Sequence, residues 1–546
     1  MNRTEFFNSL LSKQEYVPPQ SDLTPYSGKW DESTSNHLLK RLCFGAKVED
    51  VKRLAAMSMS QAVDSLLNLD AIPDPPVNVY STPTVPDPDA PYGKTFVNAP
   101  LNAALPPEYY QARMNVVKAW WTGNMVQQKT TIVEKMTLFW HNHFATEADT
   151  VQAAQVVYYY YKLMRDNCLG NFKQLTFRMS KDLCMLRYLN GYLNSKNAPD
   201  ENYGRELLEL FTVGKGPDSK YTEDDVKAAA RVLTGHRINP LTSPMSYFFL
   251  FTEHDLGTKT FSSFFNNKVI AGKLDGDSEL NELITMLFDQ TETARHLVRK
   301  LYQFFIYYKI DDTIENTIIR PLADQFKANG YEIKPILSTL FKSAHFYDLY
   351  NRGCVIKNPL DYAVGMVREF SVTLPNKDLL NTYQGWGLVA ILSAYQGLNI
   401  ADPPLVSGWQ AWYQSPQYHE IWINADTLAN RNKVAEGMNS GAGINISGLI
   451  MKIDPIPFTL QMSNPSSAQE LTIDAIRYLY NLPLSDQSVQ YFKNFLYAGL
   501  PDESYWTVAW AEFQAKPNDP IVKSAVSTRL SSFYKEIISQ AEYHLS

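Results

Sequence analysis

Apolar residues recur three and four positions apart along most of this chain, which is the spacing of amphipathic helices. The pattern predicts helices over residues 33–44, 109–128, 130–141, 150–166, 200–213, 222–234, 277–289, 291–308, 314–328, 332–344, 358–372, 425–438, 468–481, 485–498 and 521–543. Gly45, Gly214 and Gly235 stand where helices are expected to end. Thr222 with Asp225 predicts a capping box. The fold class is therefore mainly α, a multi-helix globular bundle.

Two segments interrupt the helical pattern. Residues 70–107 contain ten prolines and almost no periodicity, so they are expected to form a long loop. Residues 244–271 open with an aromatic and apolar run, followed by a polar turn and further short apolar runs, which predicts a small antiparallel β insert. No repeat of fixed period is present, so a solenoid is disfavoured. We expect a lead-in over residues 1–32 and one large helical domain over residues 33–546.

Charge and composition exclude several classes of protein. The 546 residues include 50 Lys and Arg against 57 Asp and Glu, so the formal net charge is −7. Without a basic surplus, the chain lacks the positive surface that binds nucleic acid. An aromatic content of 13% excludes disorder over the whole chain. The four cysteines are widely spaced, so we expect buried free thiols and not a disulfide framework or a zinc ribbon.

The location of the protein is predicted from two absences in the sequence. No apolar run reaches about 18 residues, so no membrane-spanning helix is expected. The first residues indicate an amphipathic helix without the apolar core of a secretory signal, which favours a cytoplasmic chain. The number of subunits is left open.

Several segments carry motifs of a known family. They are residues 37–41 with 44–45, 139–144, 202–212, 221–226, 233–235, 254–255 with 259–261, 403–404 with 408–409, and 542–543. In this order they resemble the bacterial family known as domain of unknown function 1800, over about residues 33–546. Its usual pattern has Trp where this chain has His236, Gly where it has Ser262-Ser263, and a glycine pair after Gly408-Trp409 that is missing here.

The resemblance implies little about chemistry, because no activity is assigned to this family. It implies a partner from a second uncharacterised family, number 1501, which is similar to the alkaline phosphatase and sulfatase superfamily. It also implies export for many members, whereas this chain shows no export signal.

Two histidines are candidate metal ligands. His141 and His143 stand at the end of a predicted helix, two positions apart. On a helix this spacing turns them about 200° apart, but at a helix end they can lie on one side. Two imidazoles on one side begin many sites for a divalent metal, here zinc, manganese or iron. Alternatively, one histidine caps the helix and the other packs against Trp140 and Phe144.

The helix over residues 200–213 has a polar face. At about 100° per residue, that face gathers four side chains into roughly a quarter turn. They are Asn202, Arg205, Glu206 and Glu209. The simple interpretation is a solvated face. The alternative is a site in which Glu206 and Glu209 share one ion or substrate and Arg205 holds a carboxylate ionised.

Three further residues are candidates outside that helix. His254 lies beside Asp255, and a neighbouring carboxylate can orient an imidazole and raise its basicity. Asp255 is explained equally well by a bond to its own turn. Trp409 is a candidate sugar platform, or it pins its loop to the core.

Two hypotheses of function follow. In the first, the chain is a metal-dependent hydrolase or oxidase. Its catalytic residues are Glu206, Glu209, Arg205 and His254, its substrate contacts are Asn202, Asp255 and Trp409, and its metal ligands are His141 and His143. In the second, the chain is a non-catalytic binding or scaffold protein whose polar stripe is structural.

Overall fold

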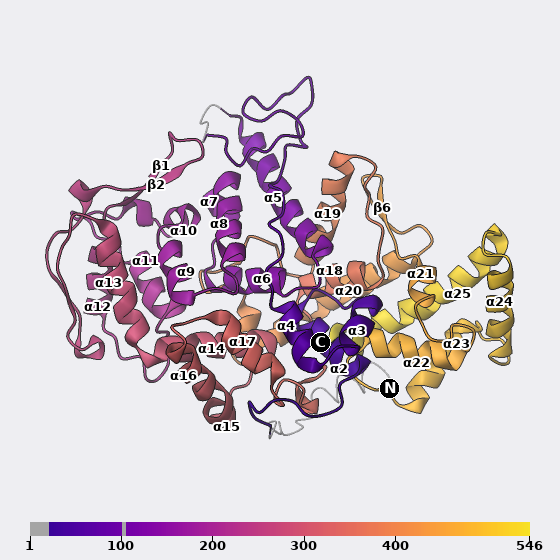
Figure 1. The fold of residues 1–546 in the computed structure, drawn as a ribbon. Helices are drawn as coiled ribbons and strands as arrows, with labels where there is room; N and C mark the ends of the chain where they lie inside the picture. Colours follow the sequence, from indigo (N-terminus) through magenta and orange to yellow (C-terminus); the bar gives the residue numbers. More distant parts are fainter. Residues whose placement is uncertain (1–20, 101–104) are drawn as a thin grey trace.

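The computed structural model describes residues 21–100 and 105–546. Helices make up most of this part of the chain (Figure 1). The helices of the first half are α2 (Glu32–Leu42), α3 (Val48–Ala55), α4 (Met59–Leu66), α5 (Pro107–Gln127), α6 (Val133–His143), α7 (Ala148–Val151), α8 (Ala154–Asp166), α9 (Phe172–Met179), α10 (Leu183–Tyr188), α11 (Asn202–Glu206) and α12 (Glu223–Val232). The helices of the second half are α13 (Gly276–Asp289), α14 (Thr291–Phe305), α15 (Asp312–Ile314), α16 (Arg320–Ala328), α17 (Ile333–Lys342), α18 (Pro359–Glu369), α19 (Leu379–Ala394), α20 (Ala425–Asn439), α21 (Pro455–Thr459), α22 (Ala468–Leu479), α23 (Asp486–Leu496), α24 (Ser504–Ala515) and α25 (Pro520–Ser539). The mainly α fold class is confirmed.

The strands form three two-stranded antiparallel sheets within the described residues. The pairs are β1 (His236–Asn239) with β2 (Ser246–Phe249), β3 (Lys259–Thr260) with β4 (Val269–Ile270), and β5 (Ile444–Ile446) with β6 (Leu449–Met451). The predicted insert is therefore present, but it begins at His236 and not at residue 244. The pair β5–β6 was not predicted, because three-residue strands are too short to show a period of two.

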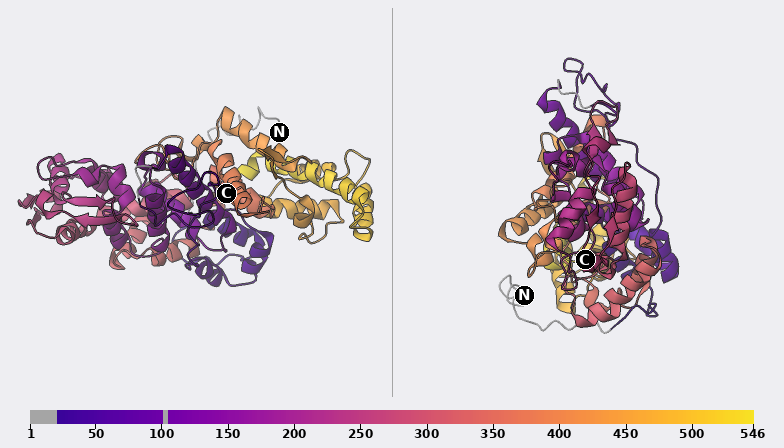
Figure 2. Two further views of the ribbon diagram at one scale, coloured as in Figure 1. Left: turned by 90° about the horizontal axis from the view of Figure 1, so that it is seen from above. Right: turned by 90° about the vertical axis from the view of Figure 1, so that its left-hand side faces the viewer.

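The molecule is elongated, with β1 and β2 near one end and α24 near the other (Figure 2). The last residues of the chain return to the middle, beside α18. The Lys357 backbone N–H donates to the His544 carbonyl at 2.7 Å, and the Tyr543 hydroxyl donates to Glu369 at 2.9 Å. One hydrophobic cluster runs from Leu38 to Tyr543. The single domain over residues 33–546 stays a prediction.

The proline-rich loop is anchored to α5 by a buried ion pair. Arg113 of α5 donates to Asp87 at 2.7 Å, and both side chains are almost fully buried. The Tyr80 hydroxyl also donates to Asp87, at 2.5 Å. A long segment without helical periodicity therefore takes a fixed course over the helices.

The structure also bears on the predictions for the cysteines, for membrane-spanning helices and for the first residues of the chain. Cys43, Cys168 and Cys184 are free and buried, as expected, and Cys354 is free and half-buried. None of the helices in the described part of the chain combines the length and the apolar character needed to cross a bilayer. The amphipathic helix expected at the start of the chain falls outside the described residues.

Helix α6 is buried along its whole length although it carries charged residues. Its Glu134 carboxylate accepts hydrogen bonds from Arg165 and Tyr161 of α8, both at 2.9 Å. Burial raises the pKa of Glu134, and the charge of Arg165 opposes that shift. Lys135 forms an ion pair with Asp361 of α18. These contacts fix α6 against α8 and α18, because a buried charge without a partner is strongly destabilising.

The Glu134–Arg165 pair gives a first prediction. In Arg165→Met, Glu134 stays buried without its cation, so the free energy of unfolding should fall by about 3–5 kcal/mol. The matched control is Arg205→Met, because Arg205 is 35% exposed in its ion pairs and such pairs contribute about 0–1 kcal/mol. Urea unfolding followed by circular dichroism measures both variants. Equal losses would contradict the assignment of Arg165 as an anchor of α6.

Candidate functional site

The end of α6 carries His141, whose ring is enclosed by aromatic side chains. Its Nδ1 lies 3.0 Å from the Tyr160 hydroxyl, which itself donates to the Phe144 carbonyl at 2.5 Å, so Nδ1 is the donor. The ring contacts Trp121 and Trp409 at centroid distances of 4.9 and 5.3 Å. Burial lowers the pKa of His141 to about 3, so the ring is neutral. Trp409 is itself buried, as expected for a residue that pins its loop.

His143 points to different neighbours. Its Nε2 donates to the Phe211 carbonyl at 3.1 Å, and its Nδ1 lies 3.4 Å from the Lys300 ammonium of α14. Lys300 also donates to the Leu210 carbonyl at 3.0 Å. Burial, reinforced by the charge of Lys300, lowers the pKa of His143. Burial also lowers the pKa of Lys300 to about 8.

These contacts do not fit a metal held jointly by His141 and His143. Both ring nitrogens of His143 have partners, one of them a cation. Within residues 21–100 and 105–546, no group of three or more His, Cys, Asp or Glu side chains is arranged to hold a metal ion. The metal role of the pair stays a prediction.

Asn142 joins α6 to the segment of Gly408 and Trp409. Its Oδ1 accepts from the Trp409 backbone N–H at 2.8 Å. Gly408 has a φ of +90°, and a Cβ there would lie 2.2 Å from the Asn142 Oδ1. Only glycine allows both this backbone conformation and this close approach. Two segments of the family pattern, residues 139–144 and 408–409, therefore meet here.

Two small cavities, each of about 20 Å³, border α6. The first, which we name the Lys300 cavity, is lined by Asn142, His143, Lys300, Ser407 and Tyr413 together with Phe139, Phe304 and Trp412. The second, the cationic cavity, is lined by Lys40, Arg41, Lys135, Asn358, Asp361 and His419 among others. Phe304 and Trp412 line both cavities, so the two are neighbours. Each has room for one or two water-sized groups.

The polar face of residues 200–213 is not the single arc that was expected. After α11 the chain continues as a π-helix, η2 (Leu207–Phe211). Its hydrogen bonds span five residues, so the side chains beyond Glu206 no longer follow the spacing of an α-helix. A π-helical turn inside a helix was not visible in the apolar pattern, because the apolar residues Leu207, Leu208 and Phe211 remain buried in it.

The charged residues of this segment pair with different partners. Arg205 makes the expected two-pronged contact, but with Glu223 of α12, at 2.9 and 2.6 Å. Hydrogen bonds from Arg205 lower the pKa of Glu223. Glu209 pairs with Lys215 at 2.5 Å. Burial, followed by the charge of Glu209, raises the pKa of Glu206.

Asn202 is exposed at the start of α11. Its side-chain amide donates to the Leu189 carbonyl at 3.4 Å. None of Asn202, Arg205, Glu206 or Glu209 lines either of the two cavities.

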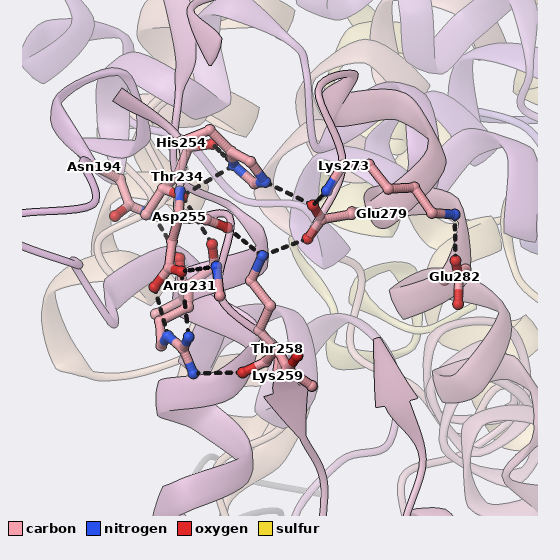
Figure 3. A network of polar contacts seen from close by, with 12 residues as sticks. Asn194, Arg231, Thr234, His254, Asp255, Thr258, Lys259, Lys273, Glu279 and Glu282 are labelled. Atoms are coloured by element: carbon pink, nitrogen blue, oxygen red, sulfur yellow. Dashed lines mark hydrogen bonds and ion pairs between the residues drawn. The ribbon is translucent and has the colours of Figure 1, made fainter. Parts of the chain in front are cut away.

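His254 belongs to a buried ionic network (Figure 3). Its Nε2 lies 2.8 Å from Glu279 of α13, and its Nδ1 lies 2.8 Å from the Thr234 carbonyl. Lys259 pairs with the other Glu279 oxygen at 2.6 Å. Burial acts to raise the pKa of Glu279, but hydrogen bonds from His254 and Lys259 hold it below its ordinary value. Both ring nitrogens of His254 therefore face buried oxygen atoms of the protein.

Asp255 does not orient His254, which corrects the sequence interpretation. Its carboxylate accepts from Arg231 at 2.6 Å (Figure 3). It also accepts from the Gly257 backbone N–H at 2.7 Å. The alternative prediction, that Asp255 binds its own turn, is confirmed. Glu279 orients the imidazole instead, from 25 residues away in the sequence.

Sequence analysis missed the cations that line the cavities. The sequence did contain one indication that Lys300 is buried. It lies on the apolar face of α14, between Leu297 and Leu301, where a charged side chain is unusual. Lys40 and Arg41 stand in the first segment of the family pattern, but were not singled out as site residues. Both are buried, which their sequence neighbours alone do not reveal.

Fold and site together define a mainly helical protein in which a fully buried polar helix borders two small cavities. The chain belongs to the DUF1800 family, because the family model described as "Protein of unknown function (DUF1800)" matches residues 37–523. This confirms the resemblance drawn from the motifs. The comparisons with curated proteins and with solved structures find no match.

The environment of Lys300 gives a second prediction. Brief acylation with acetic anhydride across pH 6–10 should modify Lys300 with a midpoint near pH 8, because burial disfavours its charged form. N-acetyl-lysinamide is the reference, with an ordinary lysine pKa of about 10.4. Peptide mass spectrometry measures the extent of modification at each pH. A midpoint for Lys300 equal to that of the reference would contradict the burial of its amine.

Proposed function

We propose that this protein is a non-catalytic helical binding protein, in which the polar motif residues hold the helices together and the cavities beside α6 take a small ligand. One observation carries the proposal. The four residues expected to be catalytic do not converge. His254 belongs to the Glu279 network, Arg205 and Glu209 have separate ion pairs, and none of these residues or Glu206 lines either cavity.

The buried networks have the properties of structural joints. The side chains of His254, Glu279 and Lys259 are fully buried and paired with one another. They connect the β insert to α13, which are distant in the sequence. A satisfied buried network of this kind specifies packing without any catalysis. The partner from the uncharacterised family 1501 stays a prediction of the resemblance.

A second candidate function has one observation in its favour. The Lys300 amine lies in a cavity, and burial lowers its pKa to about 8. Such an amine serves as a base or a nucleophile near neutral pH. If the acylation experiment above gives Lys300 the midpoint pH of an ordinary lysine, Lys300 is excluded as such a base or nucleophile.

Elemental analysis and thermal unfolding together test the proposed function. In Glu279→Gln, His254 and Lys259 lose their buried carboxylate, so we expect a loss of about 3–5 kcal/mol without any added metal. Plasma mass spectrometry of the purified chain, after incubation with Zn, Mn or Fe(II), should show no stoichiometric metal that depends on His141 and His143.

The opposite result is equally well defined. Stoichiometric metal that disappears in His141→Ala/His143→Ala, with melting of the metal-free protein unchanged, would establish the metal-dependent enzyme. His236→Ala is the control, because His236 is also fully buried but lies on β1, away from α6.

A further inference from the structure

The Lys300 cavity contains an amine and no acidic side chain. Its apolar part is formed by the aromatic side chains of Phe139, Phe304 and Trp412. Within residues 21–100 and 105–546, no ion pair joins Lys300 to a carboxylate. A lysine that is shielded from water and lacks a counter-charge favours its neutral form. The neutral amine is the form that acts as a nucleophile.

The contacts of Lys300 leave one side of its amine nitrogen free. Nζ donates to the Leu210 carbonyl at 3.0 Å and lies 3.4 Å from Nδ1 of His143. Besides its bond to carbon, a lysine nitrogen has three positions for a proton or a lone pair. Two of them are directed at these two acceptors. In the described part of the chain the third has no protein partner, so it is available for a lone pair.

Three polar groups of the cavity wall are donors that have no acceptor among the described residues. They are the Asn142 amide nitrogen, the Ser407 hydroxyl and the Tyr413 hydroxyl. The Asn142 amide is fixed in orientation, because its Oδ1 accepts from the Trp409 backbone N–H at 2.8 Å. A wall that combines such donors with no acidic group suits a ligand with carboxylate oxygens.

The volume of the cavity limits this ligand to a very small molecule. About 20 Å³ gives room for one or two water-sized groups. Carbon dioxide joined to the amine adds two oxygen atoms on one carbon, and these oxygens lie closer together than two water molecules in contact. An aldehyde with a carbon chain, an organic acid or a tetrahedral oxyanion is larger than this. Ser407, Trp412 and Tyr413 are half-buried, so the wall reaches the surface and a gas molecule can enter.

We propose that the Lys300 cavity binds carbon dioxide and holds it covalently as a carbamate on the Lys300 amine. The nitrogen lone pair forms a bond to the carbon of carbon dioxide. One C=O π bond breaks, its electron pair passes to the oxygen, and one proton leaves the nitrogen for water.

The carbamate has partners for each of its polar groups. Its oxygens accept from the Asn142 amide and the Ser407 hydroxyl, and its remaining N–H donates to the Leu210 carbonyl. This inference rests on the proposed function, because it names the ligand of one of the two cavities.

Carbon-13 NMR of the full-length chain, in buffer with labelled bicarbonate and a metal chelator at pH 8, tests the proposal. We expect one carbamate resonance that saturates as bicarbonate is added. Lys300→Met should abolish it, whereas Lys215→Met, which removes a 71% exposed lysine, should leave it unchanged. Ser407→Ala keeps the amine but removes one hydrogen bond to a charged group. The bicarbonate concentration at half-saturation should therefore rise about tenfold.

Chemical trapping identifies the modified residue without any variant. Triethyloxonium converts a carbamate to its ethyl ester, which peptide mass spectrometry detects as an ethoxycarbonyl group on the lysine. At pH 7 this group should be at least about tenfold more abundant on Lys300 than on Lys215, because an exposed lysine is almost fully protonated at that pH.

The proposal is overturned if no carbamate resonance saturates, if folded Lys300→Met retains it, if Ser407→Ala saturates as the parent does, or if trapping modifies Lys300 and Lys215 equally. Water alone then fills the cavity. The metal analysis is independent of these measurements. Failure here therefore leaves the proposed function standing, and metal at His141 and His143 would overturn that function alone.

Discussion

The fold depends on the complete burial of α6. A helix with no solvent-exposed face must find a partner within the protein for each of its polar groups. Glu134 is satisfied by α8 and Lys135 by α18, while Asn142 receives the backbone N–H of Trp409. His143 reaches the carbonyl of Phe211 and the amine of Lys300. One helix thereby sets the positions of elements that span residues 154–409.

This constraint explains why the candidate residues are dispersed. Several charged groups of the motif segments join separate elements, as Arg205 joins α11 to α12 and Lys259 joins the β insert to Glu279 of α13. A carboxylate already engaged in this way is not available to share an ion with a second carboxylate. The two cavities beside α6 contain buried nitrogen atoms without a carboxylate partner, which belong to Lys300, Arg41 and His419.

The sequence was most reliable for amphipathic helices with distinct ends. The capping box of Thr222 and Asp225 is present, and Gly214 and Gly235 follow the helices with a positive φ. It was less reliable where local periodicity is weak. The first strand of the insert, His236–Asn239, has too few apolar residues to show alternation. In the π-helical turn at Leu207–Phe211, the apolar side chains stay buried but the polar side chains no longer share one face.

The sequence by itself determined the helical class, the family, and the residue types from which a site can be built, because periodicity and motif order are properties of neighbouring positions. Only the tertiary structure decided which of those residues meet. Glu279 and not Asp255 orients His254, and Lys300 of the distant helix α14 stands beside His143. The physical reason is that burial and ion pairing join residues from distant segments, and the pattern around each residue carries no information about which distant partner it will face.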